Sequence, residues 1–437
     1  MARMTDLALH PASRPVEGVV RPPGSKSQTV RALLLAALAE GRSQIDRLLL
    51  ADDTRLMVDA LRGLGVLIAL EESALRASVS GCGGRWPNDA AQLFCGNAGT
   101  VARFLTAACC LGTGEYVLDG SSRMRCRPMR PLVDALRDLG AQLSADADED
   151  FLPLRVAARG LRGGRTALRG AESSQFLSAL LMAAPRAAGD VFIEATGTLV
   201  SAPYVRMTLA MMEESGAAVL AEGLERFVVP APQAYAPATI EIEPDATAAS
   251  YFFAAAAVTG GRVTVPGLGC GSVQGDLAFL DVLRDMGCVV EQSPDATTVI
   301  GPRDGALRGV HADLQSMPDV APTLAVLALF AAGPTRLRRV AHLRHKESDR
   351  LAALGTGLSR LGAEVEFHED GLTIHPPPAP RPAEIETHDD HRMVMSFALA
   401  TLRLDGIVLR DVECVAKSYP GFFDDWRRLT GQVQGTP

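Results

Sequence analysis

The sequence lacks any apolar run long enough to cross a membrane. A spanning helix needs roughly 18 or more apolar residues in succession, and the 437-residue chain contains no such stretch. The segment MARMTDLALHPAS at its start also lacks the apolar core of a secretory signal peptide. We therefore expect a cytoplasmic protein without a membrane partner.

The sequence also lacks an excess of basic residues. Its 43 lysines and arginines are outnumbered by 51 acidic residues, which gives a formal net charge of −8. Nucleic-acid-binding proteins usually present a net basic face, so we expect no nucleic-acid partner. A hydrophobic content of 47% argues against disorder, and the length allows two domains with full cores. Any basic site must therefore be local.

Patterns typical of metal sites and disulfides are missing as well. The eight cysteines form no CxxC motif, so we expect reduced, structural thiols. The segment HDDH places His388 and His391 beside two carboxylates, but a closed zinc site needs two further ligands at suitable spacing. The segment PGSKS lacks the glycine pattern of a P-loop. We expect no metal and a different mode of anion binding.

What the sequence does contain is one unit repeated six times. The first element of each unit is an apolar helix that ends in glycine and leads into a β-branched strand. The six copies are spaced 72 to 75 residues apart and end at Gly41, Gly114, Gly189, Gly261, Gly333 and Gly406. Glycine just past a helix is the usual left-handed cap, so we expect these glycines to cap the helices.

A second, amphipathic helix follows in each unit with its own terminal glycine. These glycines are Gly65, Gly140, Gly216, Gly287, Gly362 and Gly431. From the residues alone, one unit reads as strand, helix, strand, strand, helix, strand. A helix that is apolar on all sides must be buried on all sides, whereas an amphipathic helix keeps one face exposed to solvent. We expect the first helix type inside, with sheets and the second type around it.

Six such units exceed a single core, which indicates two domains of three units each. The proline-rich segment VVPAPQAYAPATIEIEPD favours a boundary between the third and fourth units. A second crossing is expected near Pro22 and Pro23, with the strand LALHPA returned to the later domain.

Polar residues gather at the starts of the apolar helices and on adjacent loops. Helix starts attract phosphate and carboxylate, so we expect more than one anionic substrate. For any single serine, threonine or asparagine, simple helix capping explains the residue equally well. Arg31 and Arg103 favour function, because an unpaired buried guanidinium is costly. The group comprises Lys26, Ser27, Arg31, Asn97, Thr100, Arg103, Arg127, Ser173, Ser174, Gln175, Asp245, Asp319, Lys346, Glu347, Arg350, Asp390, His391, Arg392 and Lys417.

These motifs resemble the EPSP synthase family, the 3-phosphoshikimate 1-carboxyvinyltransferases, over essentially the whole chain. The motifs that carry the resemblance are PGSKS at 23–27 with Arg31, GNAGT at 96–100 with Arg103, RP at 127–128, SSQ at 173–175, KESDR at 346–350, DHRM at 390–393 and AKSYP at 416–420. Each motif is modest alone, but together in this order they are highly specific.

The resemblance implies an α/β fold, a two-domain inside-out α/β barrel of six βαβαββ repeats, three per domain, with parallel interior helices. It implies one domain at 25–243 and a second at 1–24 and 244–437, with hinges near 22–25 and 240–245. The implied reaction moves the enolpyruvyl group of phosphoenolpyruvate to the 5-hydroxyl of shikimate 3-phosphate and releases phosphate, by addition and elimination through a tetrahedral intermediate. The implied enzyme serves chorismate and aromatic amino acid biosynthesis, uses no metal or other cofactor, and is a monomer.

The resemblance also implies which residues bind each substrate. Shikimate 3-phosphate is expected to contact Lys26, Ser27, Arg31, Ser173, Ser174, Gln175, Ser201, Tyr204, Asp319, His342 and Lys346. Phosphoenolpyruvate is expected to contact Lys26, Asn97, Gly99, Thr100, Arg127, Gln175, Arg350, Arg392 and Lys417. Four of the residues are expected to be catalytic: Asp319 as base for the 5-hydroxyl, Glu347 with Lys26 in proton transfer, and Lys417 in charge stabilisation. The sequence leaves open which group protonates the methylene carbon.

Three residues depart from the family pattern. Val30 stands where asparagine is common, Phe104 where proline or leucine is usual, and His342 where asparagine often touches the shikimate phosphate. Phe104 puts in doubt any inference about the herbicide glyphosate, although Gly99 leaves the adjacent space open. Two alternatives remain: the related UDP-N-acetylglucosamine enolpyruvyl transferases, and an inert homologue that only binds anions.

Overall fold

The structure is a computed structural model, and it describes residues 6–145, 151–170, 172–303 and 306–435. The chain divides into two compact units. The 24–242 unit is one continuous segment, and the 243–437 unit also contains residues 1–23. No helix among the described residues has both the length and the apolar character that crossing a membrane requires.

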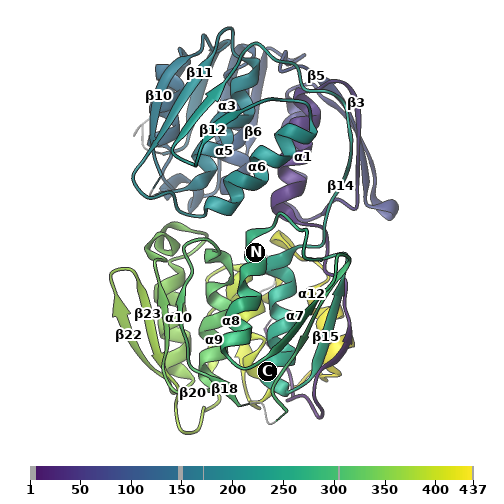
Figure 1. Cartoon of the computed structure of the whole chain (residues 1–437), viewed down its shortest axis with the longest axis vertical. Helices are drawn as coiled ribbons and strands as arrows, with labels where there is room; N and C mark the ends of the chain where they lie inside the picture. The colour runs from purple at the N-terminus through teal and green to yellow at the C-terminus, as the bar shows by residue number, and fades with distance from the viewer. Residues whose placement is uncertain (1–5, 146–150, 171, 304–305, 436–437) are drawn as a thin grey trace. The chain divides into compact units, whose positions relative to one another are not determined.

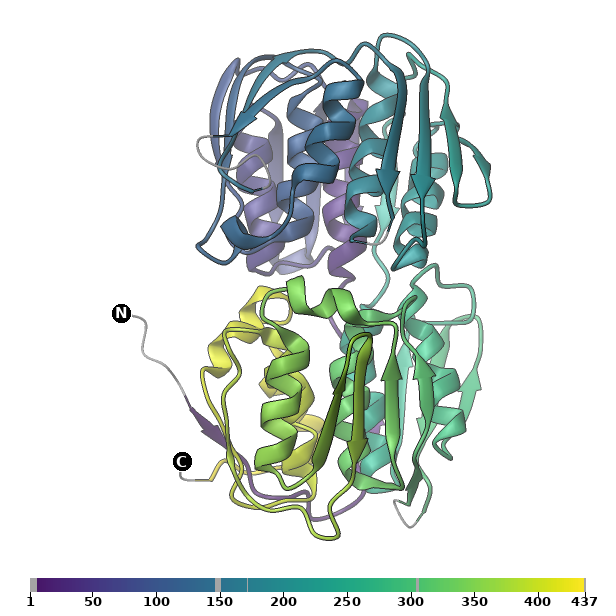
Figure 2. The same cartoon turned by 90° about the vertical axis from the view of Figure 1, so that its left-hand side faces the viewer.

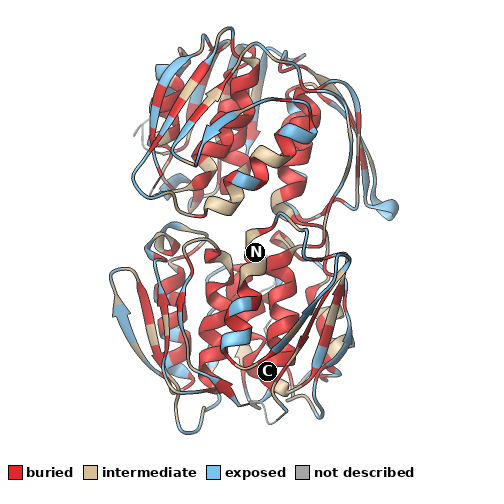
Figure 3. Cartoon of the chain, in the orientation of Figure 1, coloured by how far each residue is buried: buried red, intermediate tan, exposed pale blue. Residues whose placement is uncertain are grey.

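Each unit is built around three interior helices that lie side by side (Figures 1 and 2). In the 24–242 unit these are α1 (Lys26–Leu38), α3 (Gly99–Cys109) and α5 (Ser174–Ala183). In the 243–437 unit they are α7 (Ala246–Thr259), α9 (Ala321–Leu327) and α11 (His391–Phe397). Every residue of α9 and α11 is buried, and so is α7 from Ala246 to Val258 (Figure 3). The prediction that the apolar helices are interior is confirmed.

A second set of helices lies outside the first. These helices are α2 (Asp52–Gly63), α4 (Arg130–Asp138), α6 (Ala202–Glu214), α8 (Phe279–Asp285), α10 (Arg350–Arg360) and α12 (Phe422–Thr430). The glycine after each has a positive φ, between 68° and 108°, as a left-handed cap requires. The glycine prediction is thus correct for the outer helices.

For the interior helices the glycine prediction is wrong in part. Gly41 and Gly114 lie inside the strands that follow α1 and α3, not at the helix ends. A Cβ on Gly114 would lie 2.0 Å from the backbone oxygen of Asp89, so this glycine permits close strand packing. The left-handed cap of α7 is Gly260, one residue before the expected Gly261.

Four-stranded sheets cover the helices of the 24–242 unit. The orders are β14-β3-β5-β4, β6-β7-β9-β8 and β10-β11-β13-β12. The strands are β3 (Glu40–Asp46), β4 (Leu67–Glu71), β5 (Arg76–Cys82), β6 (Ala90–Phe94), β7 (Thr113–Asp119), β8 (Gln142–Ala145), β9 (Leu154–Arg159), β10 (Gly164–Arg169), β11 (Val191–Thr196), β12 (Leu220–Glu222), β13 (Arg226–Val229) and β14 (Thr239–Glu241).

Two four-stranded sheets and two smaller ones cover the 243–437 unit. Their orders are β16-β17-β15-β2, β19-β21-β23-β22, β1-β25-β24 and β18-β20. The strands are β1 (Leu7–Ala8), β2 (Glu17–Val19), β15 (Arg262–Pro266), β16 (Val289–Gln292), β17 (Ala296–Ile300), β18 (Leu307–Arg308), β19 (His311–Asp313), β20 (Ala331–Ala332), β21 (Thr335–Arg338), β22 (Glu364–His368), β23 (Gly371–His375), β24 (Glu384–Ile385) and β25 (Val408–Leu409).

The strand order within a repeat is βαβαββ. In the second repeat, for example, β7 alone separates α3 from α4, and β8, β9 and β10 separate α4 from α5. The order read from the residues, with two strands after each helix, is therefore wrong, and the order implied by the resemblance is right. The reason is that β6 pairs parallel to β7, and a parallel pair needs a helical crossover between its strands.

Strands distant in sequence complete the first and last repeats. β14 lies parallel to β3 and supplies the first strand of the first repeat. β1 pairs antiparallel with β25, and Leu9 forms a bridge with Gln434. These pairings place the segment 7–9 in the 243–437 unit.

Candidate active site

The helix starts of the 24–242 unit carry caps as well as candidate ligands. Ser25 caps α1 by accepting from the backbone N–H of Gln28, and Ser173 caps α5 by accepting from that of Gln175. Ser174 opens α5 and is buried, and Thr100 lies in the first turn of α3. For Ser173 the capping alternative therefore applies.

Lys26 is held by a carboxylate of its own unit. Its Nζ lies 3.0 Å from Oδ2 of Asp53, and the two side chains are only 15% and 8% exposed. Asp53 belongs to the first turn of α2. Asp53 does not stand out in the sequence, because an acidic residue in a first helical turn is an ordinary feature.

Arg31 is buried among uncharged acceptors. Its Nε donates to Oγ1 of Thr208 at 2.7 Å, and Nη1 donates to the backbone oxygen of Ser27 at 3.0 Å. Its Nη2 donates to Oγ of Ser178 at 3.3 Å and to the backbone oxygen of Tyr204 at 3.1 Å. Burial lowers the pKa of Arg31 to about 10. Ser178 and Thr208 were missed, although each is a polar residue inside an apolar helical stretch.

Two further guanidinium groups lie around the start of α3. Arg103 Nη1 donates to Oε1 of Gln175 at 2.5 Å. Arg127 Nη1 donates to the backbone oxygen of Asn97 at 2.9 Å and to its Oδ1 at 3.2 Å. A Cβ on Gly99 would lie 2.6 Å from Nη2 of Arg127 and 2.9 Å from Nη1 of Arg103. Glycine is therefore required for this approach of two arginines to the helix start.

Ser201 and Tyr204 mark the start of α6. Ser201 is buried in the left-handed region, with a φ of 55°. Tyr204 contributes its backbone oxygen to Arg31 and, at 2.8 Å, to the hydroxyl of Thr208. The structure thus brings Ser27, Arg31 and Tyr204 together, as well as Gln175 with Arg103.

Asp319 is the centre of the charged cluster in the 243–437 unit. It lies in the 3-10 helix Pro318–Val320, directly before α9. It accepts from Nη2 of Arg392 at 2.8 Å and from Nη1 of Arg350 at 3.2 Å, and Nζ of Lys346 lies 3.7 Å away. Burial alone would raise its pKa, but Arg392, Lys346 and Arg350 together hold the pKa of Asp319 below its usual range.

Arg350 opens α10 and joins three carboxylates. Its Nε donates to Asp390 at 2.8 Å, Nη2 to Glu347 at 2.7 Å, and Nη1 to Asp319. Burial opposes its charge, yet Asp390, Glu347 and Asp319 raise the pKa of Arg350 above its ordinary value. Four of the predicted site residues, Asp319, Glu347, Arg350 and Arg392, are thereby linked directly.

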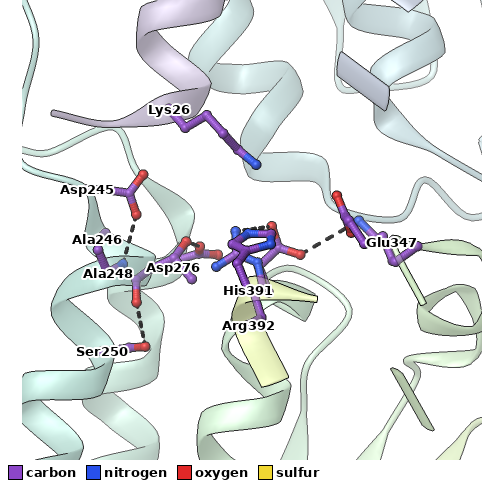
Figure 4. Close-up of polar contacts among 12 residues, drawn as sticks. Lys26, Asp245, Ala246, Ala248, Ser250, Asp276, Glu347, His391 and Arg392 are labelled. Carbon is purple, nitrogen blue, oxygen red and sulfur yellow. Dashed lines mark hydrogen bonds and ion pairs between the residues drawn. The ribbon is translucent and has the colours of Figure 1, made fainter. Parts of the chain in front are cut away.

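Carboxylates also cap two interior helices of this unit. Asp245 accepts from the backbone N–H of Ala248 at 2.8 Å, which Figure 4 shows at the start of α7. Asp390 accepts from the backbone N–H of Arg392 at 3.0 Å, at the start of α11. Nη1 of Arg392 donates to the Tyr251 hydroxyl at 3.4 Å, which brings α7 and α11 together.

Three more polar groups lie near this cluster. Nε2 of His342 is buried without a hydrogen-bond partner in the described part of the chain, and burial with nearby Lys346 lowers its pKa to about 3. Lys417 ends the 3-10 helix Val412–Lys417 and is buried. Burial and then Asp319 raise the pKa of Asp276 to about 6, and its carboxylate accepts from the Thr247 hydroxyl. Asp276 was missed by the sequence analysis, because nothing in GDLAF suggests a buried acid.

The cysteines match the prediction in part. All eight are free thiols. Four of them, Cys95, Cys109, Cys110 and Cys288, are buried, as structural thiols should be. Cys126 and Cys270 are exposed, so a structural role does not extend to them. Across the described ranges, no group of three or more His, Cys, Asp or Glu side chains is arranged to hold a metal ion.

Comparisons with known proteins agree with this arrangement. A family model described as EPSP synthase (3-phosphoshikimate 1-carboxyvinyltransferase) matches residues 11–426. A Sulfurovum protein named 3-phosphoshikimate 1-carboxyvinyltransferase is 48% identical over 96% of this chain and 98% of its own length. A protein of the same name from Nostoc punctiforme is 44% identical over 98% of this chain and 100% of its own.

Solved structures give the same result. EPSP synthase from Acinetobacter baumannii superposes with a TM-score of 0.82 at 27% identity, covering 99% of this chain and 100% of that one. The enolpyruvyl transferase NikO from Streptomyces tendae shares the fold, with a TM-score of 0.80 at 21% identity over 99% of this chain and 100% of its own. With the expected inside-out α/β fold confirmed and the family model matched nearly end to end, the chain belongs to the EPSP synthase family.

Proposed function

We propose that this chain transfers the enolpyruvyl group of phosphoenolpyruvate to the 5-hydroxyl of shikimate 3-phosphate and releases phosphate. The observation that carries the proposal is the environment of Asp319, an ionised carboxylate surrounded by Arg350, Arg392 and Lys346. A base among cations suits a reaction that removes a proton from a hydroxyl while binding two anions. The name shared by relatives 44–48% identical supports this reaction.

Substrate binding is expected to make Asp319 a better base. Without substrate, Arg392 and Arg350 hold its pKa low, and a carboxylate of low pKa is a weak base. A phosphate or carboxylate that takes over these guanidinium groups would weaken their hold on Asp319. The pKa of Asp319 would then rise towards its ordinary value when phosphoenolpyruvate is bound, which is when a base is needed.

The proposed reaction has two balanced steps. In the addition, the 5-oxygen bonds to C2 of phosphoenolpyruvate, Asp319 takes the hydroxyl proton, and C3 gains a proton to become a methyl group. In the elimination, the methyl group loses a proton, the C2–C3 double bond returns, and the bond from C2 to the phosphate oxygen breaks. Glu347 and Lys26 are proposed for the proton transfers at C3, and Lys417 for the charge on the departing phosphate.

Both units are proposed to contribute substrate contacts. For shikimate 3-phosphate the residues are Lys26, Ser27, Arg31, Ser173, Ser174, Gln175, Ser201, Tyr204, Asp319, His342 and Lys346. For phosphoenolpyruvate they are Lys26, Asn97, Gly99, Thr100, Arg127, Gln175, Arg350, Arg392 and Lys417. The buried, unpartnered Nε2 of His342 supports its inclusion, because a polar atom without a partner is available to a ligand.

A coupled phosphate-release assay tests the proposal. The purified chain should release phosphate from shikimate 3-phosphate plus phosphoenolpyruvate, and should not when UDP-N-acetylglucosamine replaces the shikimate compound. Binding of both substrates without release would favour an inert anion-binding protein. Phosphate release from phosphoenolpyruvate with UDP-N-acetylglucosamine, but not with shikimate 3-phosphate, would favour a UDP-N-acetylglucosamine enolpyruvyl transferase.

The proposal extends to a monomer that acts in the cytoplasm on two small molecules, without a nucleic-acid or membrane partner. Each unit has a hydrophobic core of its own, which supports a monomer, since neither needs a second chain to cover its interior helices. Light scattering at assay concentration should give a mass near 46.1 kDa.

A further inference from the structure

Two buried arginines of the 24–242 unit lie over the faces of phenylalanine rings. Cζ of Arg31 is 5.1 Å from the ring centroid of Phe104, and Cζ of Arg103 is 4.8 Å from that of Phe176. Each arginine thus stacks on an aromatic ring from the next interior helix in the chain, from α1 to α3 and from α3 to α5. The geometry of the first stack is repeated by the second.

Burial makes the first stack energetically important. Arg31 is 1% exposed, and the Phe104 ring is fully buried. Cation–π attraction grows when water is removed from both partners, because neither the charge nor the ring face is then solvated. An exposed stack of the same kind has a much smaller effect.

Arg31 has no carboxylate partner in the described part of the chain. Its four acceptors are the hydroxyls of Thr208 and Ser178 and the backbone oxygens of Ser27 and Tyr204, all uncharged. A buried cation is usually paired, because loss of hydration is costly. Phe104 therefore adds the negative electrostatic potential of its ring face to that of the four acceptor oxygens.

A ring face and a carboxylate differ in how much of the guanidinium's electrostatic attraction for a second anion they cancel. A carboxylate carries a full negative charge and cancels most of the attraction of the guanidinium for a second anion. The ring acts through its quadrupole, which carries no net charge. An arginine held by a ring therefore keeps its full positive charge for a ligand.

We propose that Phe104 is a positioning residue that holds the Arg31 guanidinium in place without neutralising it, so that the group can bind the anionic shikimate 3-phosphate. Phe104 does not touch the substrate and acts through Arg31. The identity of the ligand rests on the proposed function, whereas the role of the ring in holding Arg31 does not.

Fluorinated phenylalanines at position 104 test the proposal, because fluorine weakens the quadrupole while the ring keeps nearly the same shape. The full chain would carry one, two or three fluorines on this ring. We expect the KM for shikimate 3-phosphate to rise stepwise, to about tenfold with three fluorines. The kcat and the thermal midpoint should stay near those of the unmodified chain, because packing is preserved.

The chain offers a matched control. Cζ of Arg165 lies 4.5 Å from the ring centroid of Phe192, but this stack is on the surface of β10 and β11, and Arg165 is exposed. The same fluorinated series at Phe192 should leave the KM for both substrates unchanged. An equal rise at Phe192 would overturn the proposal, because the effect would then not depend on Arg31.

A second readout needs no activity. In protein labelled with ¹⁵N-arginine, exchange of the Arg31 Nε–H proton with water should become faster as fluorines are added at position 104. Unchanged exchange, or a KM that stays flat across the series, overturns the positioning role. Faster exchange in a chain that releases no phosphate would instead reject the proposed function and retain Phe104 as the residue that holds Arg31.

Discussion

The two units hold their buried arginines in different ways. In the 24–242 unit, Arg31 has only uncharged acceptors and an aromatic ring around it among the described residues. In the 243–437 unit, Arg350 donates to three carboxylates, and Arg392 donates to Asp319. The pKa values move accordingly: burial lowers that of Arg31, whereas the carboxylates outweigh burial and raise that of Arg350.

The difference indicates a division of labour between the units. A cation without a carboxylate retains its charge for a phosphate, so the Arg31 group of the 24–242 unit is suited to binding an anion directly. In the 243–437 unit an incoming anion must compete with Asp319 for Arg392, and its arrival changes the basicity of Asp319. The Arg31 group is thus suited to binding, and the Asp319 cluster to coupling binding with proton transfer.

The largest expected effect breaks this coupling in the 243–437 unit. Asp319→Asn keeps the shape of the side chain but removes the base and the charge between Arg350 and Arg392. We expect kcat to fall by about 10³, because loss of a general base typically costs that much. The phosphate-release assay measures it, and calorimetry should still detect binding of shikimate 3-phosphate.

Asp370→Asn is the matched control in the same unit. Asp370 also accepts from an arginine, with Nη2 of Arg336 at 2.5 Å, but its side chain is 42% exposed and lies outside the candidate site. Its kcat should stay within about twofold of the original. Near-original turnover in Asp319→Asn would remove Asp319 from the mechanism.

The next prediction compares the two arginines directly. Arg350→Met removes the cation that joins the buried carboxylates of Glu347 and Asp390, while Asp319 keeps Arg392. We expect a loss of about 4 kcal/mol in unfolding free energy. Arg31→Met leaves only neutral groups, of which Thr208 and Ser178 already bond each other at 2.9 Å, and we expect about 2 kcal/mol.

The chain allows each unit to be followed separately. It has two tryptophans, Trp86 in the 24–242 unit and Trp426 in the 243–437 unit, and both are buried. Variants that keep only one tryptophan are unfolded in urea and followed by fluorescence. Trp86 then reports the loss of unfolding free energy in Arg31→Met, and Trp426 reports the loss in Arg350→Met. Equal losses in the two units would contradict the proposed difference between charged and uncharged partners.

The helices of the fold could be predicted from the sequence because their pattern is repeated. Six apolar helices at a constant spacing indicate interior helices, and the outer-helix glycines predict their caps. The order of the strands is harder to predict, because two-residue strands such as β24 and β25 are too short to show alternating polar and apolar residues. The pairing of β1 with β25 is a contact between segments about 400 residues apart, which local patterns cannot specify.

The site shows the same limit. Charged residues in unusual places, such as Arg31 inside an apolar helix, stand out in the sequence. Their partners do not: Asp53 looks like a first-turn acid, and Thr208 like any helical threonine. The role of Asp276 depends on burial and on its neighbour Thr247, and both are set by tertiary packing. A sequence therefore shows which groups are costly to bury more readily than what stabilises them.

The next prediction concerns how Asp276, a buried carboxylate near Asp319, makes the stability of the 243–437 unit depend on pH. Burial and then Asp319 raise the pKa of Asp276 from its ordinary 3.8 to about 6. The folded protein therefore binds this proton more tightly than the unfolded chain does, and the resulting stability is lost as the pH rises from about 4 to about 6. Asp276→Asn should remove that loss, so the variant should gain about 3 kcal/mol over the original chain at pH 7.5 and almost nothing at pH 4. Trp426 fluorescence in urea measures the difference, and a gain independent of pH would contradict the assignment.

The smallest expected effect concerns how closely the 24–242 unit brings its arginines together. Gly99→Ala would place a methyl group 2.6 Å from Nη2 of Arg127, a distance that forces the guanidinium to move. Because Arg127 is a proposed ligand of phosphoenolpyruvate, we expect its displacement to raise the KM for phosphoenolpyruvate about fivefold, with the KM for shikimate 3-phosphate nearly unchanged. Gly63→Ala in α2 is the control, since its Cβ would lie 3.4 Å from Leu93 Cδ2, an ordinary contact. If Gly99→Ala leaves the KM for phosphoenolpyruvate unchanged, Arg127 does not bind that substrate.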